Sequence, residues 1–174
     1  MTALGCAAYH AIVNPYQSLF QAFGTAHLRY LVVGGVAVNL HGYPRFTGDV
    51  DILLALDEDN LARMTTLMHE LGYVERLPID LSQFARPEKV RRWLKEKNVR
   101  AYTFQSDVQP ALDVDVLVAE SLGFDNLDSH KSVIEAWGIP IPVVSIDDLI
   151  AMKRAAARPQ DVQDIEVLLE LKGQ

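Results

Sequence analysis

The sequence predicts an α+β protein in which a mixed central sheet is flanked by helices. Short apolar runs rich in Val, Ile and Leu alternate with segments of helical periodicity along the chain, which is the pattern of a sheet covered by helices. Gly138 also stands between two apolar segments that are close enough to form a hairpin. At least one strand pair is therefore expected to be antiparallel, and the sheet to be mixed rather than purely parallel.

The length of the chain, 174 residues with a hydrophobic fraction of 49%, fits one domain with a real core. The sequence contains no internal repeat and no low-complexity linker. We therefore expect a single domain over residues 1–174. Within it, residues 1–13 are weakly patterned and are expected to be loosely ordered or to pack as an extra turn, and residues 145–174 are expected to form a C-terminal helical part.

The N-terminal half is expected to begin with a helix at Asn14-Pro15, because asparagine is a good capping residue and proline fits the first helical position. Gly24 is expected to end this helix. Further along, Asp57 caps a segment with apolar residues on one face, and Gly72 stops it. The other expected elements are strands over 29–33 and 49–56, an edge strand over 73–77, a short helix over 36–41 and a helix over 57–71.

The C-terminal half is expected to contain four strands and three helices. Ser145 is a capping residue and Gly138 a hairpin turn, while a turn with Asp107 and Pro110 joins two strands. The expected strands cover 99–104, 111–119, 131–137 and 139–144, and the expected helices cover 87–98, 147–157 and 160–172.

The net charge of -7 and the pI of about 5.1 argue against broad nucleic-acid binding by the whole surface. One short stretch departs from this acidic balance. It is either a solvated helix face or a local groove that steers an RNA acceptor. Its basic residues are Arg86, Lys89, Arg91, Arg92, Lys95, Lys97 and Arg100.

Cys6 is the single cysteine, so an internal disulfide and a Cys-rich zinc site are excluded. One free thiol is typical of a reducing compartment. No apolar run is long enough to cross a bilayer, and the N-terminus lacks the basic leader of a signal peptide. The five histidines show no ligand spacing. We therefore expect a cytoplasmic protein without membrane contact and without zinc.

The most informative motif is the pair Asp49 and Asp51 in the segment GDVDILL. Residues i and i+2 of a strand point to the same side, so these two carboxylates share one face and repel each other. A divalent cation such as Mg²⁺, which binds oxygen ligands, relieves that repulsion. The alternative is a solvated strand end beside a loop, but the apolar neighbours make uncompensated carboxylates costly.

Two further features extend this site. Asp113 and Asp115 repeat the i, i+2 spacing in a later strand, with the alternative that one of them caps a turn or faces solvent. Gly34-Gly35 follows a strand and precedes a short helix. A glycine turn at such a place presents backbone N–H groups to phosphate, or it simply reverses the chain. Taken with the first acidic pair, these features predict a metal–nucleotide site.

The order of these features resembles the DNA polymerase beta-like nucleotidyltransferase superfamily. Three blocks carry the resemblance: VGGVAV at 33–38, RFTGDVDI at 45–52 and LDVDVL at 112–117. The C-terminal segments DLIAMKR at 148–154 and RPQDVQD at 158–164 are similar to the abortive-infection, type IV toxin-like branch of small bacterial nucleotidyltransferases. The resemblance covers most of the chain and implies a nucleotidyltransferase fold.

This resemblance implies a role for each acidic residue. Asp49 and Asp51 would hold two Mg²⁺ (or Mn²⁺) ions that bridge the phosphates of an NTP. A third carboxylate would complete the metal site nearest the acceptor hydroxyl and help to deprotonate that hydroxyl. Asp115 is the first choice for this position, and Asp113, on the same strand face, is its rival.

The resemblance also implies a set of nucleotide-binding residues. Gly34 and Gly35 would bring backbone N–H groups to the triphosphate, and Lys153 would reach it as a point charge, unless Lys153 is an ordinary exposed charge. The weaker candidates for the phosphate or acceptor side are Arg45, Thr47 and Arg158.

Three other observations accompany the resemblance. Many members of the superfamily have Gly-Ser in the glycine turn, whereas this chain has Gly-Gly and lacks the serine hydroxyl. Asp161 and Asp164 lie at i and i+3 of an expected helix, where the first interacts with the helix dipole or either orients Lys153 or Arg158. His41, near the glycine turn, is expected to have a packing or capping role.

The implied reaction is transfer of a nucleoside monophosphate from an NTP to an acceptor hydroxyl with release of pyrophosphate. In the toxin-like branch the acceptor would be a tRNA 3′ end or a protein side chain, and an antitoxin or other partner protein would hold the activity off. A small-molecule acceptor, as in aminoglycoside-modifying relatives, is an alternative. A further alternative is a catalytically inactive nucleotidyltransferase fold that serves as a binding or regulatory module.

Overall fold

A computed structural model describes residues 14–96, 100–106, 112–117 and 123–173. The expectation for residues 1–13 and the turn containing Asp107 and Pro110 lie outside the described residues. Within the described parts, no helix is both long and apolar enough to span a membrane.

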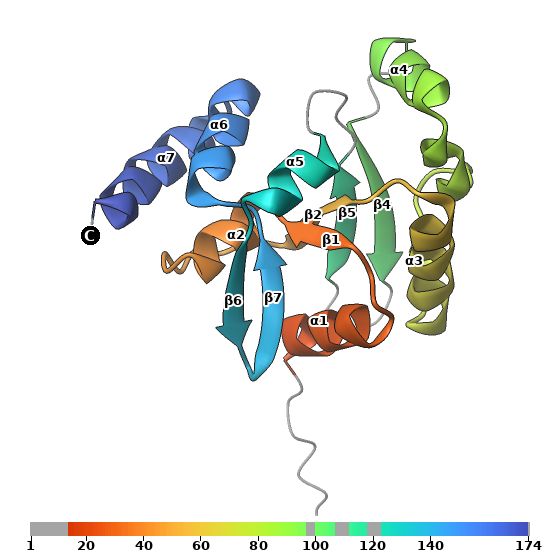
Figure 1. The fold of residues 1–174 in the computed structure, drawn as a ribbon, viewed down its shortest axis with the longest axis horizontal. Helices are drawn as coiled ribbons and strands as arrows, with labels where there is room; N and C mark the ends of the chain where they lie inside the picture. The colour runs from red at the N-terminus through yellow and green to blue at the C-terminus, as the bar shows by residue number, and fades with distance from the viewer. Residues whose placement is uncertain (1–13, 97–99, 107–111, 118–122, 174) are drawn as a thin grey trace, which may run out of the picture.

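The centre of the molecule is a seven-stranded mixed sheet with the strand order β3-β4-β5-β2-β1-β7-β6 (Figure 1). The pairs β2–β5 and β1–β7 are parallel, and the other neighbouring pairs are antiparallel. The α+β fold class, the edge position of β3 and the β6–β7 hairpin around Gly138 are confirmed. The strands are β1 (Tyr30–Val32), β2 (Asp49–Leu54), β3 (Tyr73–Glu75), β4 (Ala101–Ser106), β5 (Asp113–Leu117), β6 (Ser132–Ala136) and β7 (Ile139–Val143).

Helices cover this sheet, and α6 and α7 pack against each other at one end of it (Figure 1). At the other end, α3 and α4 each contact η1. Asn14, Asp57 and Ser145 cap their helices as expected, each accepting a hydrogen bond from a backbone N–H of the first turn. The helices are α1 (Pro15–Thr25), α2 (Gly34–Leu40), α3 (Glu58–Glu70), the 3₁₀ helix η1 (Leu81–Ala85), α4 (Pro87–Glu96), α5 (Phe124–Ser129), α6 (Ile146–Ala156) and α7 (Pro159–Lys172).

The structure differs from the expected elements in three places. Helix α1 continues through Gly24, and the chain turns only after it, at His27, whose φ is 51°. Helix α2 begins at Gly34 instead of Val36, so the glycine pair itself forms its first turn. The short elements η1 and α5 were not predicted, because five or six residues are too few to show a helical period.

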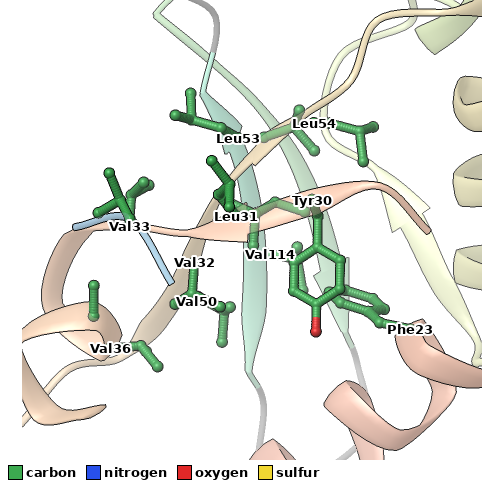
Figure 2. Close-up of a cluster of buried hydrophobic side chains, with 14 of the residues drawn as sticks. Phe23, Tyr30, Leu31, Val32, Val33, Val36, Val50, Leu53, Leu54 and Val114 are labelled. Carbon is green, nitrogen blue, oxygen red and sulfur yellow. The ribbon is translucent and has the colours of Figure 1, made fainter. Parts of the chain in front are cut away.

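The apolar core fixes β2 and β5, the two central strands that carry the acidic residues. Figure 2 shows Tyr30 of β1 pointing toward Phe23 of α1, and their ring centroids are 5.1 Å apart in an edge-to-face arrangement. Val50 of β2 and Val114 of β5 are fully buried in the same cluster. Because side chains alternate along a strand, burying these valines turns their acidic neighbours to the opposite face of the sheet.

Candidate active site

The strand register sets the acidic residues of β2 and β5 beside each other. In this parallel pair Asp49 lies opposite Asp113, and Asp51 lies opposite Asp115. Three of these four carboxylates form a cluster, because single oxygen atoms of Asp49, Asp51 and Asp115 all lie within 4.8 Å of one another. Asp113 is outside this cluster, and its Oδ1 accepts a hydrogen bond of 3.4 Å from the backbone N–H of Ser106. Two strands distant in sequence thus combine their carboxylates.

The carboxylate cluster is electrostatically unfavourable by itself. Burial, then repulsion from Asp49 and Asp115, raises the pKa of Asp51 to about 6, and the cations Arg158 and Lys153 offset part of this shift. Oδ1 of Asp115 is buried and has no hydrogen-bond partner among the described residues. A buried oxygen without a partner costs free energy, so the donor set of three carboxylates fits a hard divalent cation.

Gly34 stands directly against one of these carboxylates. Its φ is +62°, and a β-carbon at this position would lie 1.9 Å from Oδ2 of Asp51. A side chain there would displace the acid, so only glycine allows the first turn of α2 to approach β2 this closely.

Gly35 is confined in a different way. A β-carbon on Gly35 would lie 2.7 Å from Oγ1 of Thr47 and 2.9 Å from Nη2 of Arg45. Thr47 in turn donates a hydrogen bond of 3.2 Å to Oδ1 of Asp49. The second glycine therefore makes room for the loop that holds Asp49 in place.

Helices α6 and α7 provide a second wall, and it is cationic. Lys153 of α6 is only 6% exposed. Its Nζ donates to Oδ1 of Asp161 at 3.2 Å and to Oδ2 of Asp164 at 2.7 Å, both on α7. An ammonium group has three N–H donors, so these two contacts leave one more. Lys153 lines the same cavity as the three clustered acids, and it is not an ordinary exposed charge.

Asp164 is the acid that holds the cations of this wall together. It is fully buried, and its Oδ2 also accepts a hydrogen bond of 3.0 Å from Nη2 of Arg45. Nε of Arg45 lies 3.0 Å from Oδ1 of Asp164 in the same ion pair. Asn39 of α2 fixes Arg45 from the other side through two hydrogen bonds of 2.9 Å with its backbone. Asn39 was not predicted as a site residue, because an asparagine inside a helix gives no sequence signal of a contact with a loop six residues later.

Two further residues considered from the sequence are Arg158 and His41. Arg158 lies between α6 and α7, lines the cavity and is near enough to Asp51 to lower the pKa of that carboxyl. Its backbone N–H donates to Oδ2 of Asp161 at 3.0 Å, so Asp161 holds both Lys153 and the start of α7. Nε2 of His41 donates a hydrogen bond of 2.8 Å to the carbonyl oxygen of Val144, in keeping with a packing role.

The acidic and cationic walls enclose one cavity of about 460 Å³. The described residues that line it include Gly34, Gly35, Thr47, Asp49, Asp51, Asp115, Lys153 and Arg158. A cavity with carboxylates on one wall and cations on the other suits a ligand that carries both a divalent cation and phosphate groups.

The fold and this site define a nucleotidyltransferase. A family model described as "Nucleotidyl transferase AbiEii toxin, Type IV TA system" matches residues 17–174, and the chain belongs to that family. This confirms the resemblance drawn from the sequence. No curated protein matched the sequence.

Solved structures of nucleotidyltransferases share this fold at low sequence identity. The lincosamide antibiotic adenylyltransferase LnuA has a TM-score of 0.60 and 16% identity, with 90% of this chain and 95% of that chain covered. An antigenic nucleotidyltransferase-like protein from Paracoccidioides brasiliensis has a TM-score of 0.60 and 17% identity, with 89% and 73% covered. ANT(2'')-Ia has a TM-score of 0.55 and 13% identity, with 88% and 84% covered.

Proposed function

We propose that this nucleotidyltransferase moves a nucleoside monophosphate from an NTP to an acceptor hydroxyl in a Mg²⁺- or Mn²⁺-dependent reaction. The observation that carries the proposal is the cluster of Asp49, Asp51 and Asp115, whose oxygens lie within 4.8 Å of one another in a cavity that also contains Lys153. In the reaction the acceptor oxygen forms a bond to the α-phosphorus. The bond from that phosphorus to the bridging oxygen breaks, and pyrophosphate leaves.

The three acids have separate roles in this proposal. Asp49 and Asp51 hold the cations, and Asp115 completes the set on the acceptor side. When bound, a divalent cation neutralises phosphate charge and makes the acceptor hydroxyl more acidic. The Asp115 carboxylate, which lines the cavity, receives the hydroxyl proton in this proposal. Asp113 is expected to be dispensable, since its carboxylate bonds the backbone of Ser106.

The opposite wall binds the triphosphate. The third N–H of Lys153 and the guanidinium of Arg158 supply positive charge, and the first turn of α2 at Gly34 and Gly35 supplies backbone donors. Thr47 acts through Asp49, to which it donates a hydrogen bond. Arg45 also lines the cavity and shares Asp164 with Lys153. Holding both reactants in one cavity reduces the entropic part of the barrier.

The acceptor is proposed to be a tRNA 3′ end or a protein side chain, and the protein to act as the toxin of a toxin–antitoxin pair. The family description supports the toxin role and, with it, an antitoxin partner. Growth arrest on expression, relieved by Asp51→Asn, is the expected outcome. Arrest that persists in this variant would contradict a catalytic toxin.

The reaction itself is tested by incubating the protein with Mg²⁺ and each of four α-labelled NTPs. Total RNA, the protein itself and a cell extract serve as acceptors. Label is expected in one acceptor fraction, and it should disappear with Asp49→Asn. The matched control is Asp128→Asn, which removes an aspartate from a surface pair with Lys131 and should leave labelling unchanged. No label with any NTP and any acceptor would contradict the proposal.

A small-molecule acceptor is a second candidate. Two structures with this fold were determined with antibiotic ligands, LnuA with lincomycin and ANT(2'')-Ia with adenylyl-2''-tobramycin. Lincomycin and tobramycin therefore belong among the acceptors tested. Label on either compound, and none on RNA or protein, would favour this second function.

A further inference from the structure

A second cavity adjoins the active-site cavity on the same face of the sheet. It has a volume of about 340 Å³ and lies between the ends of β2 and β5, η1, α4 and α5. Leu117 of β5 lines both cavities. In a strand, Leu117 shares a face with Asp115 and lies about 6.6 Å further along. A molecule whose reactive group is at Asp115 can therefore extend over Leu117 into the second cavity.

The second cavity is mostly apolar, and two phenylalanines, Phe84 and Phe124, line it. Phe84 of η1 is almost fully buried, and Leu53 and Val90 are buried as well. Phe124 of α5 is held in place by the Arg29 guanidinium, which lies 5.4 Å from the ring centroid and pairs with Asp57 and Asp125. The volume is at the lower end of the range for ligand sites. It suits one flat ring system and not a large ligand.

The charges around this cavity select the kind of molecule that enters it. Arg91 is the one ionisable side chain among the described residues that line the cavity, which include no carboxylate. Helix α4, which forms one side, has the sequence PEKVRRWLKE with four basic and two acidic residues, in a chain with a net charge of -7. A polycationic acceptor would find no counter-charge in the second cavity, whereas an acceptor with phosphates would find it on α4.

We propose that the second cavity binds the terminal nucleobase of a single-stranded RNA acceptor, with the RNA backbone along α4 and the terminal ribose hydroxyl at Asp115. This assignment rests on the proposed function, because it takes Asp115 as the acceptor side of the reaction. It assigns the second cavity to the acceptor and not to the NTP base, since Lys153 and the glycine turn bind the triphosphate at the other side of the carboxylates. Bases stack on aromatic side chains whatever their identity, so the proposed site is sequence-tolerant.

The test fills the cavity without removing core atoms. Ala85→Phe places a ring in it, because Ala85 lines the cavity and is partly exposed. The matched control is Ala22→Phe, also at a partly exposed alanine that lines a surface hollow, but on α1. The probes are a short fluorescein-labelled single-stranded RNA and the same RNA with an abasic 3′ terminal nucleotide, measured by fluorescence anisotropy without NTP. Calorimetry with an NTP and Mg²⁺ is run on the same proteins.

We expect the wild type and Ala22→Phe to bind the abasic RNA at least about fivefold more weakly than the complete RNA. Ala85→Phe should bind both RNAs equally weakly while keeping wild-type NTP affinity. Equal binding of both RNAs by the wild type, or no RNA binding at all, would overturn the assignment and leave the nucleotidyltransferase function in place. A loss of NTP affinity in Ala85→Phe would overturn it as well, by assigning the cavity to the NTP base.

The proposed contact between α4 and the RNA backbone is tested separately, by the salt dependence of RNA affinity. Replacing Arg92 and Lys95 by glutamine should reduce the slope of log affinity against log salt concentration by about 0.7 for each phosphate contact that is lost. An unchanged slope would contradict the placement of the RNA backbone along α4. Absence of NTP binding in the wild type would instead contradict the proposed function, whatever the RNA measurements give.

Discussion

Gly34 and Asp51 are packed so closely that a β-carbon on Gly34 would lie 1.9 Å from Oδ2 of Asp51. The contact joins the first turn of α2 to Asp51, the carboxyl whose pKa burial raises to about 6. The glycine at this place does more than reverse the chain, because it brings the donors of a helix start and an acid into direct contact. The candidate active site depends on this approach.

Gly34→Ala is therefore expected to abolish nucleotidyl transfer and to destabilise the protein. The matched control is Gly72→Ala, since Gly72 also has a positive φ, +83°, but nothing within 4 Å of a β-carbon. The control should lose only about 1–2 kcal/mol from backbone strain. Gly34→Ala should lose more, because Asp51 must move. Urea unfolding measures both variants, and equal losses would contradict the packing argument.

Asp164 joins Arg45 and Lys153, and removing its charge is expected to weaken NTP binding at a distance. Asp164→Asn leaves the buried Lys153 and the partly buried Arg45 without a full counter-charge, at a cost of about 3–5 kcal/mol in stability. Lys153 then loses its position, so the Kd for NTP should rise while the acid cluster still binds cations. Calorimetry measures both affinities.

An exposed ion pair provides the control for this effect. Lys172 and Asp147 pair on the surface with half or more of each side chain exposed. Asp147→Asn should cost less than about 1 kcal/mol and leave NTP affinity unchanged. If Asp164→Asn behaved like Asp147→Asn, the buried pair would have no positioning role.

The free energy of unfolding is expected to change with pH because Asp51 ionises. Its pKa is raised from 3.8 to about 6 in the folded protein, so folding favours the protonated form. Its contribution to stability is complete below pH 3.8 and is lost as the pH rises through about 6. The difference amounts to about 3 kcal/mol. Without divalent cations, Asp51→Asn should therefore be more stable than the wild type above pH 6.

Urea unfolding across pH 4 to 8 in a chelating buffer measures this difference. Asp128→Asn serves as the control, since Asp128 lies in a surface pair with Lys131. A stability difference between Asp51→Asn and the wild type that stayed constant with pH would show that the carboxyl of Asp51 does not titrate in this range.

Cation binding separates the two candidates for the third ligand. Mg²⁺ at a concentration 100 times its Kd should stabilise the wild type by about 2.7 kcal/mol. Asp115→Asn is expected to lose this stabilisation because Asp115 belongs to the carboxylate cluster. Asp113→Asn should keep it, since Asp113 bonds Ser106 instead. Thermal unfolding with and without Mg²⁺ gives the answer, and the opposite result for the two variants would make Asp113 the ligand.

The sequence by itself determined the local structure around the first acidic pair, including the strand face that the two aspartates share. Alternation in β2 set Asp49 and Asp51 on one face and Val50 on the other, and capping residues such as Asn14 and Ser145 fixed where helices begin. These features depend on neighbours in the chain, which local spacing describes. The single domain over residues 1–174 remains a prediction.

The tertiary structure decided which distant residues meet. The parallel register of β2 and β5 brought Asp115, and not Asp113, into the cluster with Asp49 and Asp51. The packing of α7 on α6 placed Asp164 between Lys153 and Arg45. Contacts of this kind depend on strand order and helix packing. No local pattern in the sequence encodes these, because they depend on how the side chains of the whole core pack together.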